Sequence, residues 1–153
     1  MKQLSFIFAV IVMLFSVGCT PSGETTKTKE RIGIKFVEGE TYEAVLRKAQ
    51  VENKPIFIDF YTTWCKPCKW LEKDVFQLEN VADYYNANFI SYKVNAEDFD
   101  GVALAQQYEV GAYPTLIFLT KDGTFLRKHE GTTSASNFMS WGKSAVLKNQ
   151  EAL

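Results

Sequence analysis

The sequence is poor in the residues that build metal sites and disulfide-stapled scaffolds. Its 153 residues include three cysteines, three methionines and one histidine, His129. Three cysteines are too few for a scaffold held by disulfides, and with one histidine only a marginal combination could supply four zinc ligands. Each cysteine therefore needs its own explanation.

An excess of one charge is also lacking. Seventeen Lys and Arg stand against 18 Asp and Glu, the net charge is −1, and no Lys/Arg-rich run is present. Without a positively charged surface the chain has little means of attracting the phosphates of a nucleic acid, which disfavours a nucleic-acid-binding function. The 46% apolar and 14% aromatic content is typical of one globular domain with a small extra segment. Catalysis or protein contact is therefore the expected kind of function.

The only long apolar run lies near the start of the chain, over residues 4–17. It follows a charged residue, is short for a bilayer span, and ends in a small residue before Cys19, as in an export signal. The stretch Ser-Val-Gly-Cys at 16–19 resembles the lipobox of bacterial lipoproteins, although Ser16 stands where leucine is usual. We therefore expect a lipoprotein-type signal peptide over 1–18 and a lipid on Cys19. The alternative is an ordinary secretory signal in which Cys19 is incidental.

A polar segment follows Cys19 and separates it from the first apolar residues of the domain. Residues 20–31 contain no aliphatic or aromatic side chain beyond Pro21, so they cannot bury enough surface to fold. We expect residues 19–35 to form a flexible tether, which at ~3.3 Å per residue could extend about 40 Å over its polar part. A frayed terminus is the alternative. Under either interpretation the domain occupies residues 36–153, and the lipid would place it on the bacterial cell envelope, exported and facing the periplasm.

From residue 36 onward, the spacing of apolar residues predicts alternating helices and strands. We expect strands at 56–61, 89–94, 115–119 and 124–129. We expect helices at 42–53 after a Thr41 cap, along a Cys68, Leu71, Val75 and Leu78 stripe, briefly at 81–85, at 101–108 closed by Gly111, and after a Ser134 cap. Residues 55–94 read as a strand-helix-strand crossover, and the turn at 121–123 makes the last two strands a hairpin. The fold class is therefore α/β, a central mixed sheet flanked by helices.

Cys65 and Cys68 lie at the N-terminus of a predicted helix that follows a buried strand, the position at which open α/β sheets usually have their functional sites. At a spacing of three residues both sulfurs face one side of the first turn, and Pro67 fits there because no amide donor is needed. Cys65 is nearer the unpaired N–H groups and the positive end of the helix dipole, which favour the thiolate. We expect Cys65 to attack and Cys68 to resolve.

Other uses of this cysteine pair are less well supported by the sequence. A zinc half-site would find only His129 as a further ligand unless two chains shared the metal. Haem attachment needs a histidine where Lys69 stands, and a structural bridge across two residues would restrain the unfolded chain little. Once the signal peptide is removed, copper delivery would have one further methionine, Met139, and one histidine. A binding module without turnover would use a groove around Trp64, Tyr113 and Pro114.

Two stretches resemble the thioredoxin family. Asp-Phe-Tyr-Thr-Thr-Trp-Cys-Lys-Pro-Cys-Lys at 59–69 is similar to its active-site segment, and Val-Gly-Ala-Tyr-Pro-Thr-Leu at 110–116 is similar to the segment around its cis-proline. The resemblance extends over about residues 41–147, and is greatest to secreted thioredoxin-like proteins and the C-terminal domain of thiol:disulfide interchange proteins. It implies a thioredoxin fold.

The resemblance also implies roles for individual residues. It makes Cys65 the nucleophile, Cys68 the resolving cysteine, Asp59 a buried carboxylate beneath them, Lys93 a partner of Asp59, and Pro114 the cis-proline. The apolar residues around Asp59 favour its burial, which would raise its pKa and allow it to exchange the proton of Cys68.

Residues around the cysteines are expected to contact substrate. Trp64 would form a platform beside the nucleophile, with Lys66, Pro67, Tyr113 and Pro114. Lys66 replaces a glycine of typical thioredoxins and Tyr113 an isoleucine, and Tyr61 stands where tryptophan is common. These departures bear on redox potential and substrate choice and leave the basic cycle intact.

The sequence therefore predicts a thiol:disulfide oxidoreductase of the bacterial cell envelope that reduces protein disulfides. It would need no cofactor beyond the Cys65–Cys68 disulfide and no metal. Its partners would be protein disulfides, a redox protein that donates or accepts electrons, and the membrane through Cys19, and it would act as a monomer. The alternatives are a disulfide oxidase or isomerase, or a chaperone-like module that binds without turnover.

Overall fold

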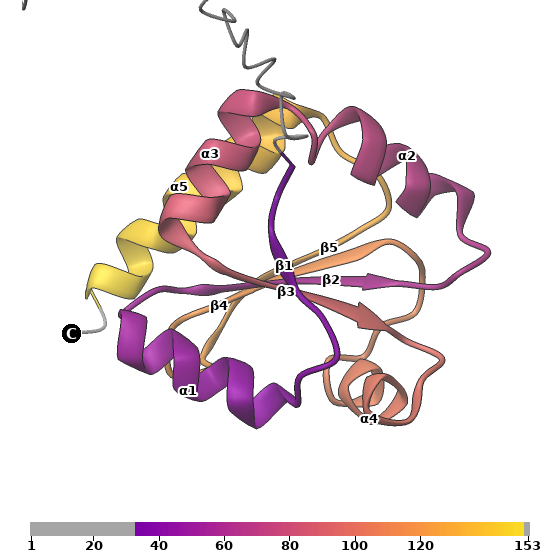
Figure 1. Ribbon diagram of the computed structural model, residues 1–153, viewed down its shortest axis with the longest axis horizontal. Coiled ribbons are helices and arrows are strands. Elements are labelled where there is room, and N and C mark those ends of the chain that lie inside the picture. Colours follow the sequence, from indigo (N-terminus) through magenta and orange to yellow (C-terminus); the bar gives the residue numbers. More distant parts are fainter. Residues whose placement is uncertain (1–32, 152–153) are drawn as a thin grey trace, which may run out of the picture.

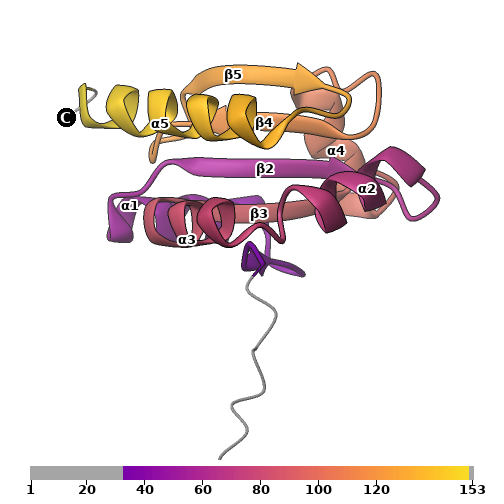
Figure 2. The same ribbon diagram turned by 90° about the horizontal axis from the view of Figure 1, so that it is seen from above.

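A twisted five-stranded sheet runs through the middle of the protein, in the order β1-β3-β2-β4-β5 (Figures 1 and 2). Its strands are β1 (Phe36–Val37), β2 (Ile56–Tyr61), β3 (Ile90–Asn95), β4 (Thr115–Leu119) and β5 (Phe125–Glu130). β2 pairs in parallel with β3 and antiparallel with β4, while β4 and β5 form the expected hairpin. The α/β class with a central mixed sheet is confirmed.

The computed structural model describes residues 33–151. The predicted signal peptide at 1–18, the lipid site Cys19 and most of the 19–35 tether lie outside the described residues. Within the described part of the chain, no helix is both long enough and apolar enough to cross a membrane.

Helices cover both faces of the sheet (Figure 1). On one face lie α2, α3 and α5, and on the other lie α1 and α4. Their bounds are α1 (Tyr42–Glu52), α2 (Lys66–Asp74), α3 (Glu79–Asn88), α4 (Phe99–Gln107) and α5 (Ala135–Glu151). The predicted caps are confirmed: Thr41 Oγ1 accepts a hydrogen bond from the Ala44 amide, and Ser134 Oγ accepts one from the Asn137 amide.

The central strand β2 is buried on both faces, as its unbroken apolar run predicts. Ile56, Ile58 and Phe60 lie in the cluster beneath α1 and α4. Phe57 lies in the opposite cluster, within 5.3 Å of the Phe118 ring centroid, and Asp59 follows it on that same face. The strand therefore holds a carboxyl group between an aromatic core and the end of the sheet.

The segment between β2 and β3 differs from the prediction. The sequence predicts a single helix whose apolar stripe runs from Cys68 to Leu78. This prediction is wrong, because α2 ends at Asp74. Phe76 leaves the helix and is buried against the Phe57 ring, at 5.9 Å between centroids, whereas Leu78 is 40% exposed and precedes α3. The short helix predicted at 81–85 is in fact the ten-residue α3.

Other boundaries shift by one or two residues. α4 begins at Phe99 rather than at 101, and the left-handed residue after it is Glu109, with φ of 52°, rather than Gly111. β3 and β5 each begin one residue later than predicted and extend to Asn95 and Glu130. β1 was not predicted, because two residues are too few to show a strand period.

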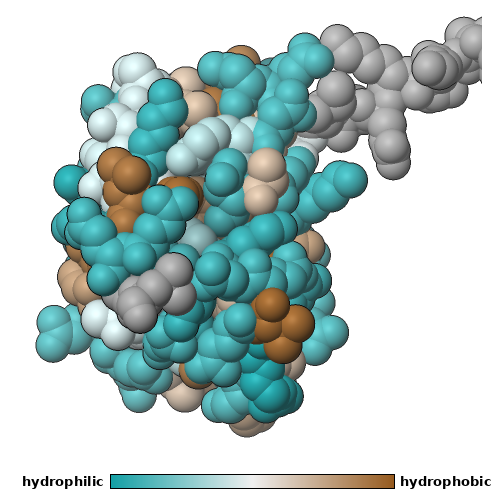
Figure 3. Space-filling model, turned by 90° about the vertical axis from the view of Figure 1, so that its left-hand side faces the viewer, coloured by the Kyte–Doolittle hydropathy of each residue, from teal (hydrophilic) through white to brown (hydrophobic). Residues whose placement is uncertain are grey.

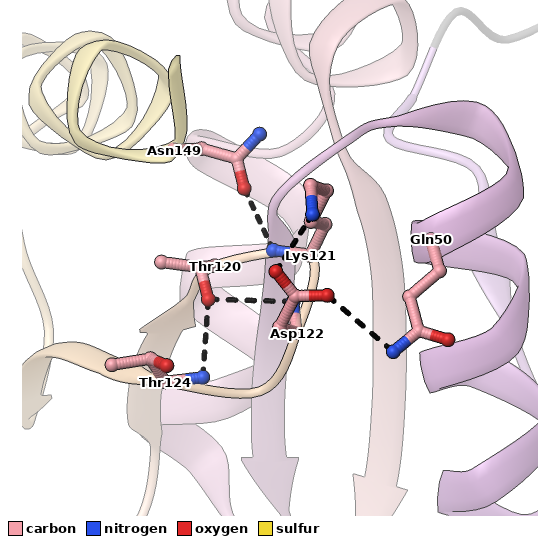
Figure 4. Close-up of polar contacts among 6 residues, drawn as sticks. All are labelled: Gln50, Thr120, Lys121, Asp122, Thr124 and Asn149. Atoms are coloured by element: carbon pink, nitrogen blue, oxygen red, sulfur yellow. Dashed lines mark hydrogen bonds and ion pairs between the residues drawn. The ribbon is translucent and has the colours of Figure 1, made fainter. Parts of the chain in front are cut away.

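A polar cluster fixes the β4–β5 turn to both helical layers (Figure 4). Thr120 Oγ1 accepts hydrogen bonds from two backbone amides of the turn, at 3.3 and 3.1 Å. Asn149 of α5, itself buried, accepts one from the Lys121 amide at 2.7 Å, and Gln50 of α1 donates to Asp122 at 3.5 Å. This turn lies at the left of Figure 1, away from the end to which β2 points. Figure 3 looks onto that side, which is mainly hydrophilic with separated hydrophobic residues.

Candidate active site

Cys65 and Cys68 form a disulfide where β2 passes into α2. Cys65 is the N-cap of α2, and its Sγ accepts a hydrogen bond from the Cys68 amide at 3.1 Å. The two residues are 3% and 7% exposed. The sulfur of Cys65 therefore meets the unpaired N–H groups of the helix start, the environment that favours a thiolate after reduction.

The second predicted segment reaches the same end of the sheet. The peptide bond between Tyr113 and Pro114 is cis, as the family resemblance implies. Pro114 directly precedes β4, and the antiparallel register pairs Thr115 with Phe60, near the end of β2. Two segments some 50 residues apart in sequence thus meet where β2 ends.

Asp59 is buried on β2, where it pairs with Leu116 of β4. It is 3% exposed, and its Oδ1 has no hydrogen-bond partner among the described residues. Burial raises the pKa of Asp59 to about 7, an effect that the positive charge of Lys93 opposes and the negative charge of Glu72 reinforces. The carboxyl group can therefore take up or release a proton near neutral pH.

Lys93 lies opposite Asp59 in the parallel register of β2 and β3. Its ammonium group is nevertheless paired with Glu72, at 2.9 Å from Oε2, and lies 4.8 Å from the Tyr61 ring centroid. Lys93 thus acts on Asp59 only through the electrostatic effect of its charge, whereas it forms a direct ion pair with Glu72. Glu72 was missed from the sequence, although its position four residues after Cys68 places it near that cysteine on the helix surface.

Aromatic side chains border the disulfide. Trp64 is 64% exposed, its ring lies 6.2 Å from the Tyr113 ring in an edge-to-face arrangement, and its Nε1 donates to Glu97 at 2.8 Å. Lys66 and Pro67 are exposed in the first turn of α2. The predicted contact residues therefore lie around the cysteines, and Glu97, which orients Trp64, was not predicted.

His129, the further ligand that a zinc site at the cysteine pair would have needed, lies on a different strand. His129 is on β5, where its ring packs 4.6 Å from the Trp141 ring and its Nε2 lies 3.1 Å from the Thr132 carbonyl oxygen. Within residues 33–151, no three His, Cys, Asp or Glu side chains are grouped as metal ligands. The chemistry that these geometries support directly is that of the cysteine pair.

The order of the strands, the disulfide at the start of α2 and the cis-proline beside it define a protein of the thioredoxin fold. Residues 42–145 match the family model described as a thioredoxin-like domain. The chain belongs to the thioredoxin-like family.

Individual relatives agree with this membership. The chain is 34% identical over 71 residues to Thioredoxin-1 of Drosophila melanogaster, covering 46% of this chain and 62% of that protein. A solution structure described as that of a candidate disulphide-isomerase from Bacteroides thetaiotaomicron is 40% identical, with a TM-score of 0.66 over 74% of this chain and 93% of that chain. A thioredoxin from Thermus thermophilus shares the fold at 20% identity, with a TM-score of 0.67 over 76% and 90% of the two chains.

Proposed function

We propose that this protein is a thiol:disulfide oxidoreductase that reduces protein disulfides. The observation that carries the proposal is the Cys65–Cys68 disulfide at the N-terminus of α2, with Cys65 as the cap. In the reduced protein the Cys65 thiolate attacks one sulfur of a substrate disulfide, and the other substrate sulfur leaves as a thiolate. The Cys68 sulfur then attacks Cys65 Sγ, which releases the second substrate thiolate and restores the disulfide. Two electrons pass from the cysteine pair to the substrate.

Asp59 serves the second step of this cycle. Cys68 must lose a proton before it can attack, and a carboxyl group with a pKa of about 7 is matched to accept it near neutral pH. Lys93 and Glu72 act as positioning residues, because their charges shift the proton affinity of Asp59 in opposite directions.

The substrate side is formed by Trp64, Lys66, Pro67, Tyr113 and Pro114. An exposed tryptophan held by a hydrogen bond and an edge-to-face contact presents a fixed apolar surface to an incoming polypeptide. A redox protein of the same compartment would return electrons to the disulfide, and the domain would act as a monomer without any further cofactor.

Disulfide isomerisation is the second candidate, and the 40% identical structure described as a candidate disulphide-isomerase supports it. The two functions differ in outcome. A reductase leaves substrate thiols free, whereas an isomerase rearranges a scrambled protein into its native pairing.

Trapping the mixed disulfide tests the cycle. We expect Cys68→Ala to accumulate a covalent complex with a disulfide-containing protein such as insulin, while Cys65→Ser forms none because it lacks the attacking sulfur. A complex formed by Cys65→Ser and absent from Cys68→Ala would contradict the assignment. Refolding of a scrambled protein by the wild type, without net release of thiols, would favour isomerisation.

We propose further that the protein is exported to the bacterial cell envelope and anchored by lipid on Cys19, facing the periplasm. The sequence at 16–19 and the apolar run before it support this. In the producing bacterium, Cys19→Ser should release the domain from the membrane fraction or block its processing. Unchanged cleavage together with a wild-type protein in the soluble fraction would contradict the proposal.

A further inference from the structure

The solvent-facing side of α2 has a run of positive charge that begins at Lys66 and continues along the helix beyond the substrate contacts proposed above. Lys66, Lys69 and Lys73 lie at positions i, i+3 and i+7 of the helix and Trp70 at i+4, so the four side chains share one face. All four are exposed, Trp70 to 47%. We call this set the basic stripe.

The basic stripe is not neutralised within the described part of the chain. None of the ion pairs found there includes Lys66, Lys69 or Lys73. α2 also carries two acids: Glu72 is bound to Lys93, and Asp74, next to Lys73 at the end of the helix, is in none of these ion pairs. In a chain whose net charge is −1, these three lysines form a local excess of positive charge next to an exposed indole.

The stripe begins at the disulfide, and the opposite flank of the disulfide has the opposite charge. Glu97, Asp98 and Asp100 lie where β3 passes into α4, and no described ion pair includes them. Figure 1 shows α2 and α4 on opposite faces of the sheet at the same end, beyond which β2 points. A polypeptide that reaches the sulfurs therefore meets positive charge on one side only.

We propose that the basic stripe is a docking surface for protein substrates whose disulfide is flanked by aspartate or glutamate residues. The proposal rests on the proposed function and names its substrate class. The lysines offer mobile ammonium groups to carboxylates at the rim of the encounter, and Trp70 adds an apolar contact between them. A protein segment fits this position better than an anionic membrane, because a flat surface resting on the stripe would also cover the disulfide from which the stripe starts.

Charges at the rim of an interface act mainly on the rate of association and little on the chemistry that follows. We therefore expect the stripe to raise the rate constant for acidic substrates about fivefold over basic ones at low ionic strength. Salt should remove the preference, since the Debye length is only about 3 Å at 1 M.

The test uses two synthetic peptides, each with one intrachain disulfide, identical except that aspartates or lysines flank the cysteines. The rate constant of their reduction by the reduced protein is measured at low and high ionic strength. The wild type should reduce the acidic peptide faster, and Lys69→Glu/Lys73→Glu should reverse the order. The matched control Lys48→Glu/Lys143→Glu, with the same charge change on α1 and α5, should keep it.

A neutral small disulfide, bis(2-hydroxyethyl) disulfide, separates docking from chemistry. Equal rates with this compound for all three proteins, together with the reversal above, would support the stripe. A wild type without a preference between the peptides, or a control that loses it as fully as the stripe variant, would overturn the inference while leaving the oxidoreductase intact. Failure of the wild type to reduce any of the three compounds would overturn the proposed function itself.

Discussion

Asp59 and Lys93 face each other across the β2–β3 ladder, yet the ammonium group of Lys93 is bound to Glu72 of α2. The pairing leaves the Asp59 carboxyl buried without a direct counter-ion and with one oxygen lacking a hydrogen-bond partner among the described residues. Burial of this kind disfavours the charged form and accounts for the pKa of about 7. The proton affinity of Asp59 is therefore set jointly by the core, by β3 and by the active-site helix.

A buried carboxyl group of raised pKa makes stability depend on pH. Between the ordinary value of 3.8 and about 7, the folded protein binds a proton at Asp59 that the unfolded chain releases, so the free energy of unfolding falls as pH rises. Asp59→Asn removes this dependence. In the oxidised protein we expect the variant to be more stable than the wild type at pH 8, by up to about 4 kcal/mol, since each pKa unit corresponds to about 1.4 kcal/mol.

Urea unfolding of both proteins at pH 4 and pH 8 checks this expectation. The difference between the variant and the wild type should shrink to well under about 1 kcal/mol at pH 4, where Asp59 is protonated in the folded wild type and only little more than half ionised in the unfolded chain. A difference of the same size at both pH values would show that packing, rather than charge, separates the two proteins.

Glu72 and Lys93 should shift the pKa of Asp59 in opposite directions when each is neutralised. Glu72→Gln removes a negative charge and is expected to lower it below about 7, whereas Lys93→Met removes a positive charge and is expected to raise it. The carboxyl carbon chemical shift of Asp59, followed by NMR over pH, reports both values. Asp74→Asn, at the end of the same helix, serves as the control and should shift neither way. Shifts of equal sign in the two variants would refute the charge argument.

Lys66 places a positive charge in the first turn of α2, beside the sulfur that becomes a thiolate on reduction. Stabilising the reduced form raises the redox potential, so Lys66→Gln should lower it. An exposed charge near a helix start is worth roughly 0.3–1 kcal/mol, which for two electrons is about 10–20 mV. Equilibration with glutathione measures the potential, with Lys73→Gln at the other end of the helix as the control. A fall of more than about 50 mV, or a rise, would mean that another interaction dominates.

The polar cluster at the β4–β5 turn should affect stability and leave redox chemistry unchanged. Asn149→Ala removes the acceptor of the Lys121 amide and leaves a partly buried donor unpaired, which should cost about 1–2 kcal/mol. Gln50→Ala removes only a long bond to exposed Asp122 and should change stability by about 0.5 kcal/mol or less. Equal losses in the two variants, or a changed rate of disulfide reduction in either, would contradict this division.

Several parts of the fold follow from local pattern. The helix after Thr41, the buried strand at 56–61 and the hairpin around the turn at 121–123 were all predicted, because spacing, caps and turn residues point the same way there. The break after Asp74 could not be read from the sequence. No glycine or proline marks it, and its cause is the burial of Phe76 against Phe57, a contact between residues 19 positions apart.

The candidate site likewise has features that the sequence predicts and features that it does not. The positions of Cys65 and Cys68 follow from their spacing and the strand before them, and the burial of Asp59 follows from its apolar neighbours. The contribution of Glu72 depends on which way a lysine turns between two strands and a helix, and that of Glu97 on a loop approaching Trp64. Such contacts between distant segments produce no periodic pattern in the amino-acid sequence, so they could not be predicted from it.

Phe57 and Asp59 occupy the same face of one strand, two residues apart, and this couples hydrocarbon packing to acid–base behaviour. The rings around Phe57, including Phe118 and Phe138, help to keep the interior next to the carboxyl group free of water. Substituting one of them by a smaller side chain would open room for hydration and draw the pKa of Asp59 towards its ordinary value. Under the proposed cycle, a void in the aromatic interior would thereby change the pH at which Cys68 loses its proton to Asp59.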